Sequence, residues 1–242
     1  MSYIIEIATS DFETTKSAVE GGADRIELCA NLAEGGTTAS YGTIYQCREK
    51  LDVLLYPIIR PRGGDFLYTD DEYEIMLHDL KLCKQLGCDG VVIGLLNGDG
   101  MIDEKRTGVL IEIAYPMGVT FHRAFDRCKD PFEAMEQLIK LGCERILTSG
   151  QMPTVSEGSD KIGELNKAAD HRIIIMPGSG VRKENIKMLT VKTGCTEFHS
   201  SLRRKAKSKM GFIHPAFENS EESYTNNAID AGDVRGLRDE LE

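Results

Sequence analysis

Short runs of β-branched and other apolar residues alternate with helix-like segments from one end of the chain to the other. Eight runs are predicted to be strands, at residues 3–8, 25–29, 53–60, 90–95, 118–122, 145–148, 172–176 and 197–200. Eight strand–helix units of about 30 residues each are typical of an α/β fold with a single (β/α)8 TIM barrel. An open, doubly wound sheet is the alternative, but no Gly-x-Gly-x-x-Gly motif follows the first strand.

Helix start signals support this alternation. Residues 10–13 (Ser-Asp-Phe-Glu) and 69–72 (Thr-Asp-Asp-Glu) both read as capping boxes. Asp130 followed by Pro131 is typical of an N-cap and the first helical position. We therefore expect helices to begin at these three places.

A repeated sequence motif favours a closed barrel. A glycine, a small residue and then a strand follow four of the predicted helices, beginning at Gly22, Gly87, Gly142 and Gly194. Glycine is the usual residue just after a helix because it adopts a left-handed backbone without a steric penalty. The four copies of this motif precede strands two, four, six and eight, which predicts one domain over residues 1–242. Residues 203–229 are expected to form a long polar loop after strand eight, and residues 233–241 a closing helix.

Charge and cysteine usage exclude several classes of protein. The 242 residues carry a net charge of -10, which argues against nucleic acid as a partner. No apolar run approaches the roughly 20 residues that span a bilayer. No export signal is visible at the start, so we expect a cytoplasmic protein without a membrane partner. The seven cysteines are an odd number without a Cys-x-x-Cys pair, which makes a disulfide framework improbable.

The active face of such a barrel is formed by the carboxyl ends of its strands, so the cysteines can be divided by their distance from that face. Five cysteines lie in turns on the opposite face or on helical patterns, and we interpret them as packing residues: Cys47, Cys83, Cys88, Cys143 and Cys195. Only Cys29 and Cys128 are placed where they can reach the mouth of the barrel.

Strand periodicity predicts which charged residues point inward, since side chains alternate between the two faces of a strand. In residues 26–29, Ile26 and Leu28 face the helices, which turns Glu27 and Cys29 into the barrel. The same reasoning gives a set of candidate catalytic residues: Glu6, Glu27, Arg60, His122, Glu197 and His199. In this hypothesis Glu27 or Glu6 is a general base, a histidine is the acid or orienting group, and Arg60 is the counter-charge of the substrate. The alternative is a purely structural layer in which Glu27 and Arg60 form a buried ion pair.

Small residues after the late strands suggest an anion site. Turns rich in glycine expose backbone N–H groups that suit a phosphate or carboxylate. The candidate anion-binding residues are Arg62, Ser149, Gly150, Gly178, Ser179, Gly180 and Ser200. The alternative is a tight turn that only starts a helix at Val181.

Seven stretches of the sequence together resemble the CutC family, often called copper homeostasis proteins. They are residues 21–29, 34–37, 59–68, 120–126, 145–150, 176–180 and 196–199. The resemblance implies a cytoplasmic (β/α)8 barrel that forms a homo-oligomer, acts in copper homeostasis and binds copper through Cys29. Two positions depart from the family pattern, because Ser179 stands in a typical Gly-Gly-Gly and Leu202 replaces a small residue.

Two functions are left open at this point. The first is copper handling with Cu(I) as partner and cofactor, although Cu(I) usually takes more than one soft ligand. The second is a barrel enzyme or binding protein for a small anionic metabolite, phosphorylated compounds included, which uses the Glu, His and Arg residues of the mouth. The sequence does not decide whether the protein is an enzyme.

Overall fold

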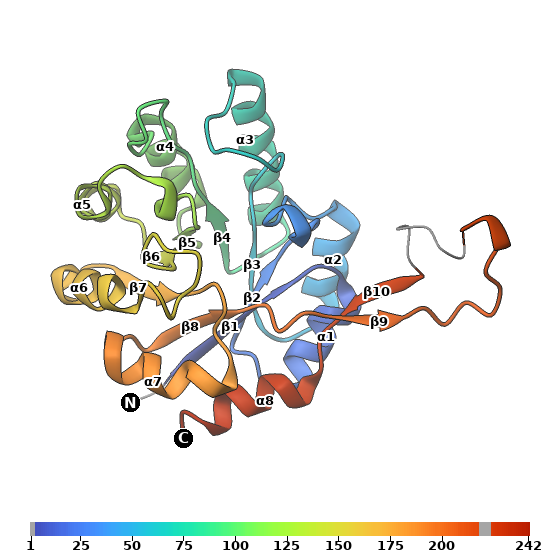
Figure 1. Ribbon diagram of the computed structural model, residues 1–242. Helices are drawn as coiled ribbons and strands as arrows, with labels where there is room; N and C mark the ends of the chain where they lie inside the picture. The colour runs from blue at the N-terminus through green and yellow to red at the C-terminus, as the bar shows by residue number, and fades with distance from the viewer. Residues whose placement is uncertain (1–2, 218–223) are drawn as a thin grey trace.

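Eight parallel strands alternate with helices in the computed structural model, which describes residues 3–217 and 224–242 (Figure 1). The strands are β1 Ile4–Thr9, β2 Arg25–Leu28, β3 Leu54–Pro57, β4 Gly90–Ile93, β5 Gly118–Phe121, β6 Arg145–Thr148, β7 Ile174–Pro177 and β8 Glu197–Ser200. The helices are α1 Phe12–Glu20, α2 Tyr41–Lys50, α3 Asp70–Gln85, α4 Glu104–Ala114, α5 Pro131–Leu141, α6 Ser159–Ala169, α7 Lys183–Thr193 and α8 Ala231–Asp239. The fold is the predicted (β/α)8 TIM barrel.

The strands form two four-stranded parallel sheets, in the orders β3-β2-β1-β8 and β4-β5-β6-β7. The two sheets meet where β3 lies beside β4 and β7 beside β8. At the first junction Ile59 N donates a hydrogen bond to Val92 O over 2.8 Å. The outward-facing apolar side chains of the strands pack against the surrounding helices and make the main hydrophobic core. The inward-facing positions are left for other side chains, and these decide what the barrel can do.

The predicted strand boundaries lie within three residues of the observed ones. Strands β6 and β8 begin and end at the predicted residues. The prediction of 53–60 is too long, because β3 ends at Pro57. After it, Ile58 makes only an isolated bridge to Val92, and the chain leaves the sheet.

Helix starts agree with the sequence at two of three places. The Thr69 capping box and the Asp130 N-cap before Pro131 are both confirmed. At α1 the residue pair is different, since the N-cap is Asp11 and its box partner is Thr14. The Asp11 carboxylate accepts from Thr14 N at 2.8 Å, while the Ser10 hydroxyl donates to that same carboxylate and is not the cap.

The repeated glycine motif is confirmed, because each of its glycines has the left-handed backbone expected after a helix. Gly22, Gly87, Gly142 and Gly194 each follow a helix end and have φ values between 67° and 89°. This is the left-handed region, where a residue with a Cβ is strained. In three copies of the motif the residue after the glycine is a cysteine that lies in the core. All five cysteines that the sequence assigned to packing are buried.

The segment at residues 203–229 is not simply a loop. Within it, β9 (Arg204–Lys207) pairs antiparallel with β10 (Thr225–Ala228), and the hairpin extends away from the barrel (Figure 1). The sequence did not predict this strand pairing, because the segment is polar and lacks the alternating apolar residues typical of a strand. Residues 218–223 of the predicted loop lie outside the described residues. Helix α8 begins two residues before the predicted start, since Asp230 caps it through Gly232 N. No helix in the described ranges is long and apolar enough to cross a membrane.

Candidate functional site

Four charged side chains form a layer across the lower half of the barrel, near the amino ends of the strands. This ion-pair layer consists of Glu6, Arg25, Arg145 and Glu197. Arg25 donates from Nε to Glu6 at 2.5 Å and from Nη2 to Glu197 at 2.6 Å, and Arg145 Nε donates to Glu197 at 2.6 Å. Burial alone would raise the pKa of Glu6, but Arg25 and a hydrogen bond from His199 outweigh it and lower that pKa strongly. The layer therefore matches two guanidinium groups with two carboxyl groups.

Tyr56 completes this layer and explains two glycines. The guanidinium carbons of Arg25 and Arg145 lie 5.3 and 5.8 Å from the centre of the Tyr56 ring. A Cβ at Gly90 or Gly118 would come within 2.2 or 2.3 Å of atoms of Tyr56. Strands β4 and β5 thus begin with glycine because the layer already fills the space.

The sequence also allowed a structural role in which Glu27 and Arg60 form a buried ion pair. The barrel does contain buried ion pairs, but other residues form them. A buried ion-pair layer exists, yet Glu27 and Arg60 do not pair with each other in the described parts of the chain. Glu197 points into the barrel as expected. Its carboxylate belongs to the ion-pair layer and does not line the cavity above it, because it stands at the first position of β8.

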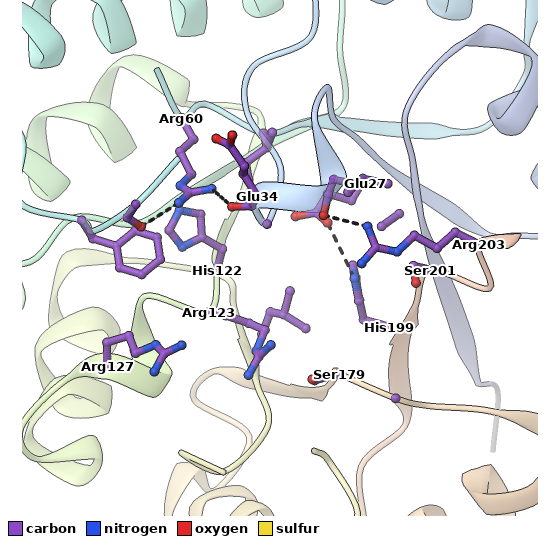
Figure 2. A pocket seen from close by; sticks show the side chains of 18 of the residues that line it. Glu27, Glu34, Arg60, His122, Arg123, Arg127, Ser179, His199, Ser201 and Arg203 are labelled. Atoms are coloured by element: carbon purple, nitrogen blue, oxygen red, sulfur yellow. Dashed lines mark hydrogen bonds and ion pairs between the residues drawn. The ribbon is translucent and has the colours of Figure 1, made fainter. Parts of the chain in front are cut away.

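Above this layer the carboxyl ends of the strands enclose a cavity of about 460 Å³, which we call the mouth cavity (Figure 2). Its ionisable lining residues are Glu27, Glu34, Arg60, His122, Arg123, Arg127, Arg182, His199 and Arg203. Five arginines against two glutamates give this cavity a positive balance in a chain of net charge -10. Figure 2 places Arg60 and His122 on one wall and Glu27 with His199 on another.

A chain of three side chains links the two layers. His199 Nδ1 lies 2.7 Å from Glu6 Oε1, and its Nε2 lies 3.6 Å from Glu27 Oε2. Burial would lower the pKa of His199, but the Glu6 hydrogen bond and the Glu27 charge raise it overall. Burial is also the main reason that the pKa of Glu27 is raised to about 7. A carboxyl group that titrates near neutral pH can both take and return a proton.

Arg60 and His122 share the opposite wall of the mouth cavity. Phe66 lies between them in contact, with its ring centre 5.0 Å from that of His122 and 5.1 Å from the Arg60 guanidinium carbon. Burial first, and then the Arg60 charge, lower the pKa of His122 to about 3. The imidazole is therefore neutral at physiological pH. Of the predicted catalytic residues, the mouth cavity brings together Glu27, Arg60, His122 and His199, with Glu6 directly behind.

Arg62 does not belong to this cavity. Its Nε donates to Glu72 at 2.5 Å and its Nη2 to Asp65 at 3.1 Å. The prediction placed Arg62 on the same face as Arg60 by extending strand alternation through Pro61. The chain has already left the sheet there, so alternation no longer applies, and Arg62 turns to the start of α3.

The loop after β6 is occupied by a side chain of the protein itself. Asp126 accepts hydrogen bonds from the backbone N–H groups of Ser149 and Gln151 and from the Thr148 hydroxyl. Gly150 N donates to Thr148 Oγ1 at 2.9 Å. Ser149 and Gly150 therefore have no N–H group to offer a ligand, and this part of the predicted anion site is wrong.

The turn after β7 behaves differently. Gly178 N donates to Thr148 O, but the N–H groups of Ser179, Gly180 and Val181 have no acceptor in the described part of the chain. Ser179 and Gly180 line the mouth cavity. The three N–H groups lie just before α7, whose positive N-terminal end also favours an anion.

Neighbouring side chains add to this turn. Arg182 Nη1 donates to Ser200 Oγ at 3.1 Å and to Val181 O at 3.0 Å. Ser200 itself is buried, with its hydroxyl donating to Val181 O, so it holds the turn and its neighbour Ser201 lines the cavity. The helix after this turn, α7, begins at Lys183 and not at the predicted Val181, since Arg182 is its N-cap.

The predicted metal residue is buried beside the carboxyl group of Glu27. Cys29 is 1% exposed and packs against Tyr56, Ile58 and Val92. Burial, and then the Glu27 charge, raise the pKa of its thiol well above the ordinary value. No group of three or more His, Cys, Asp or Glu side chains in the described ranges could hold a metal ion. Cys128 is likewise buried, in the main core.

Several functional candidates were not found by strand alternation. They are Glu34, Arg123, Arg127, Arg182 and Arg203 in the mouth cavity, and Arg25 and Arg145 in the ion-pair layer. Arg123, Arg127 and Arg182 lie in the loops after strands β5 and β7, so the rule that barrel sites lie at the carboxyl ends of strands could have indicated them. Arg25 shares the inward face with Glu27 and was detectable from the same alternation.

Comparison with known proteins agrees with this architecture. The CutC family profile matches residues 3–204 of the chain. The chain belongs to the CutC family. A CutC protein of Chromobacterium violaceum is 44% identical over all of this chain and 99% of its own, and one of Parabacteroides distasonis is 53% identical over 88% of each.

A solved structure of a CutC protein from Streptococcus agalactiae, named for copper homeostasis, is also similar. It is 33% identical, with a TM-score of 0.79 over 82% of this chain and 98% of its own. The recognition of a CutC barrel from the sequence motifs is therefore confirmed. The shared name links the family to copper homeostasis, while the residues that act are a separate question.

Proposed function

We propose that this CutC protein binds a small anionic metabolite in the mouth cavity and moves a proton on it. The observation that carries the proposal is the set of four arginines around one cavity that have no carboxylate partner in the described residues: Arg60, Arg127, Arg182 and Arg203. Arg60 is buried and the other three are exposed at the rim. An anion is the partner that a set of guanidinium groups around one cavity fits.

The turn after β7 supports a phosphate or carboxylate as the anionic group. Three consecutive N–H groups, from Ser179 to Val181, are free of acceptors in the part of the chain that the structure describes. Arg203 stands near the same rim, where its Nη1 is held by Leu32 O at 2.7 Å. Fixed donors of this kind bind tetrahedral anions without reorganisation.

The proton-transfer part of the proposal rests on Glu27 and His199. Glu27 lies in the cavity with a pKa raised to about 7, mainly by burial. His199 connects it to the ionised Glu6, which holds the imidazole in one orientation. The lining residues include no lysine or cysteine within the described ranges, so acid–base chemistry fits this cavity better than covalent catalysis.

Isothermal titration calorimetry with inorganic phosphate tests the binding step. We expect the Kd to rise by about 10-fold or more in Arg127→Gln and in Arg203→Gln, as a charge-assisted hydrogen bond contributes about 1.5–3 kcal/mol. Arg172→Gln is the matched control, because Arg172 is exposed and pairs with Glu136 away from the cavity. Absence of phosphate binding to the unmodified protein would contradict the proposal.

Copper binding through Cys29 is the second candidate, and the family name supports it. Cu(I) prefers two or more soft ligands, and the surroundings of Cys29 supply one thiol. The residues of one chain therefore do not fit a complete copper site, and a second ligand would have to come from another subunit. A Cu(I) competition titration of the unmodified protein against Cys29→Ser tests this. An unchanged Cu(I) affinity would remove Cys29 from the site.

The location and assembly of the protein complete the proposal. A reducing, cytoplasmic location is supported by seven free cysteines, all of them buried. A single domain over residues 1–242 is supported by the packing of α8 against α1 and α7. A homo-oligomer is what the CutC resemblance implies, and light scattering of the purified chain would measure it.

A further inference from the structure

Two buried N–H donors on one wall of the mouth cavity have no partner. Arg60 is 3% exposed and His122 is 4% exposed, and the atoms Arg60 Nε and His122 Nε2 lack any hydrogen bond among the described residues. A buried polar atom without a partner destabilises a fold. Both side chains line the cavity, so a bound ligand is the partner that would satisfy them.

The surroundings of His122 determine which nitrogen carries its proton. Ala124 N donates to His122 Nδ1 at 3.1 Å, so Nδ1 is an acceptor and the proton of the neutral ring is on Nε2. The ring packs directly on Gly94, where a Cβ would lie 2.2 Å from it, and Phe66 contacts it as well. His122 is therefore a neutral donor fixed in one direction.

Arg60 is fixed in a comparable way. Its Nη1 donates to Glu34 O at 2.9 Å and to Gly36 O at 2.7 Å, and its Nη2 donates to Gly64 O at 2.9 Å. Three carbonyl groups thus hold the guanidinium still and leave the Nε–H unused. Fixed donors of this kind, already aimed before the reaction, are the usual way to stabilise a negative charge that develops on oxygen.

We propose that Arg60 Nε and His122 Nε2 bind the carbonyl oxygen of a phosphorylated α-hydroxy carbonyl compound and stabilise its enolate. This inference rests on the proposed function, since the phosphate group occupies the turn at Ser179–Val181. The Glu27 carboxylate takes the proton from the carbon next to the carbonyl. The electron pair of that C–H bond forms the C=C bond, and the carbonyl π pair moves onto the oxygen. His122 Nε2 gives its proton to that oxygen and takes up the proton of the neighbouring hydroxyl group. Glu27 then returns its proton to the former carbonyl carbon, so the carbonyl and hydroxyl groups exchange places in an isomerisation without an oxidant or a cofactor.

The residue types favour this class over others. A neutral imidazole donor paired with a carboxylate base of raised pKa is the pattern of enzymes that form enolates. The route from Glu27 through His199 to Glu6 gives the proton a second place to reside.

Calorimetry with two probes isolates the inferred oxyanion donors. Phosphoglycolohydroxamate carries a phosphate and a planar enolate-like group, whereas glycerol 3-phosphate carries the phosphate without a carbonyl. We expect the unmodified protein to bind the hydroxamate at least 10-fold more tightly. We expect His122→Phe to lose that preference while it keeps its affinity for glycerol 3-phosphate.

The failures of the two proposals are distinguishable. Equal affinities for the two probes in the unmodified protein, or a preference that survives in His122→Phe, would overturn the enolate inference and leave phosphate binding standing. Failure to bind inorganic phosphate and both probes would overturn the proposed function as well. The comparison in the unmodified protein needs no variant, so it stands even if His122→Phe does not fold.

Proton exchange tests Glu27 directly. In D₂O the protein is expected to exchange the carbon-bound protons of dihydroxyacetone phosphate, followed by ¹H NMR. Glu27→Gln is expected to abolish exchange and to keep glycerol 3-phosphate binding. Exchange that persists in Glu27→Gln, or is absent from the unmodified protein, would contradict the role of Glu27 as the base.

Discussion

The two halves of the barrel interior contain similar charged side chains in opposite states. In the ion-pair layer each guanidinium meets a carboxylate within 2.6 Å, so Arg25 and Arg145 are matched by Glu6 and Glu197. In the mouth cavity Arg60 is about as buried as Arg25, yet backbone carbonyl groups hold it and no carboxylate of the described residues pairs with it. Buried charge that the fold needs is paired within the fold, whereas charge kept for a ligand is held in place and left incomplete.

The difference also explains why the mouth cavity remains a cavity. Tyr56 and two arginines fill the lower layer so completely that Gly90 and Gly118 have no room for a Cβ. The mouth cavity has space of about 460 Å³ instead, with Glu27 and His199 beneath it. The lower layer supplies rigidity, and through the Glu6–His199 hydrogen bond it also orients the upper one.

Breaking the ion-pair layer is expected to have the largest effect on stability. Arg145→Met removes one of the two arginine partners of Glu197, at a site that is 2% exposed, and leaves the layer with one positive charge against two negative ones. Loss of one member of a buried pair leaves an uncompensated charge, so we expect a loss of about 3–5 kcal/mol in the free energy of unfolding. Urea denaturation measures it. Arg127→Met at the rim is the control, with an expected change below about 0.5 kcal/mol, and equal losses would refute the comparison.

Strand alternation alone was enough to predict the inward positions on the strands. It predicted Glu6, Glu27 and His199 correctly, because a strand in a barrel has only two faces. It could not separate the two layers, since the height of a residue depends on the register between strands, which places Glu6 opposite His199 and Arg25.

Loop side chains were beyond this reasoning for a physical reason. Arg60 and Arg62 are two residues apart, yet one enters the cavity and the other pairs with Glu72. The loop after β6 looked like an anion site, and Asp126 from a different loop already occupies it. Where a loop side chain goes depends on contacts that no local pattern contains.

Glu27→Gln sharpens the comparison through its pH dependence. Glutamine stands for the protonated acid. The folded pKa of Glu27 is raised to about 7, so between the ordinary value of 4.5 and about 7 the folded state holds a proton that the unfolded state has lost. The unmodified protein therefore loses this stability as the pH rises through that window. Relative to it, Glu27→Gln should gain on the order of 2–3 kcal/mol between pH 4.5 and 7.5.

Thermal or urea denaturation at several pH values measures this gain. The difference between the two proteins should level off above the window, once Glu27 is ionised in both states. A difference that is independent of pH would mean that Glu27 is ordinary in its environment, and the mouth cavity would then resemble the protein surface.

Two glycines allow the layers to be disturbed in a matched way. A Cβ at Gly90 would meet Tyr56 in the lower layer, and a Cβ at Gly94 would meet His122 in the mouth cavity, each at 2.2 Å. Both Gly90→Ala and Gly94→Ala should destabilise the fold by about 1–3 kcal/mol through overpacking. Only Gly94→Ala should weaken hydroxamate binding, by about 10-fold, and equal weakening in Gly90→Ala would show that the two layers are not separate.

Ser179→Gly is expected to have the smallest effect and concerns the turn that holds the anion. Ser179 has φ of 76°, a left-handed conformation that suits the glycine expected there in a CutC protein. Its hydroxyl donates to Pro153 O at 2.9 Å, which offsets part of the strain. Relief of strain against the greater freedom of an unfolded glycine leaves a gain of about 0.5 kcal/mol or less. Ser179→Ala keeps the strain and loses the bond, so it should be less stable than Ser179→Gly by about 1 kcal/mol.

Phosphate affinity should be unchanged in both, because the ligand uses the backbone N–H groups. A clear loss of phosphate affinity in Ser179→Gly would mean that the hydroxyl, and not the turn, recognises the anion.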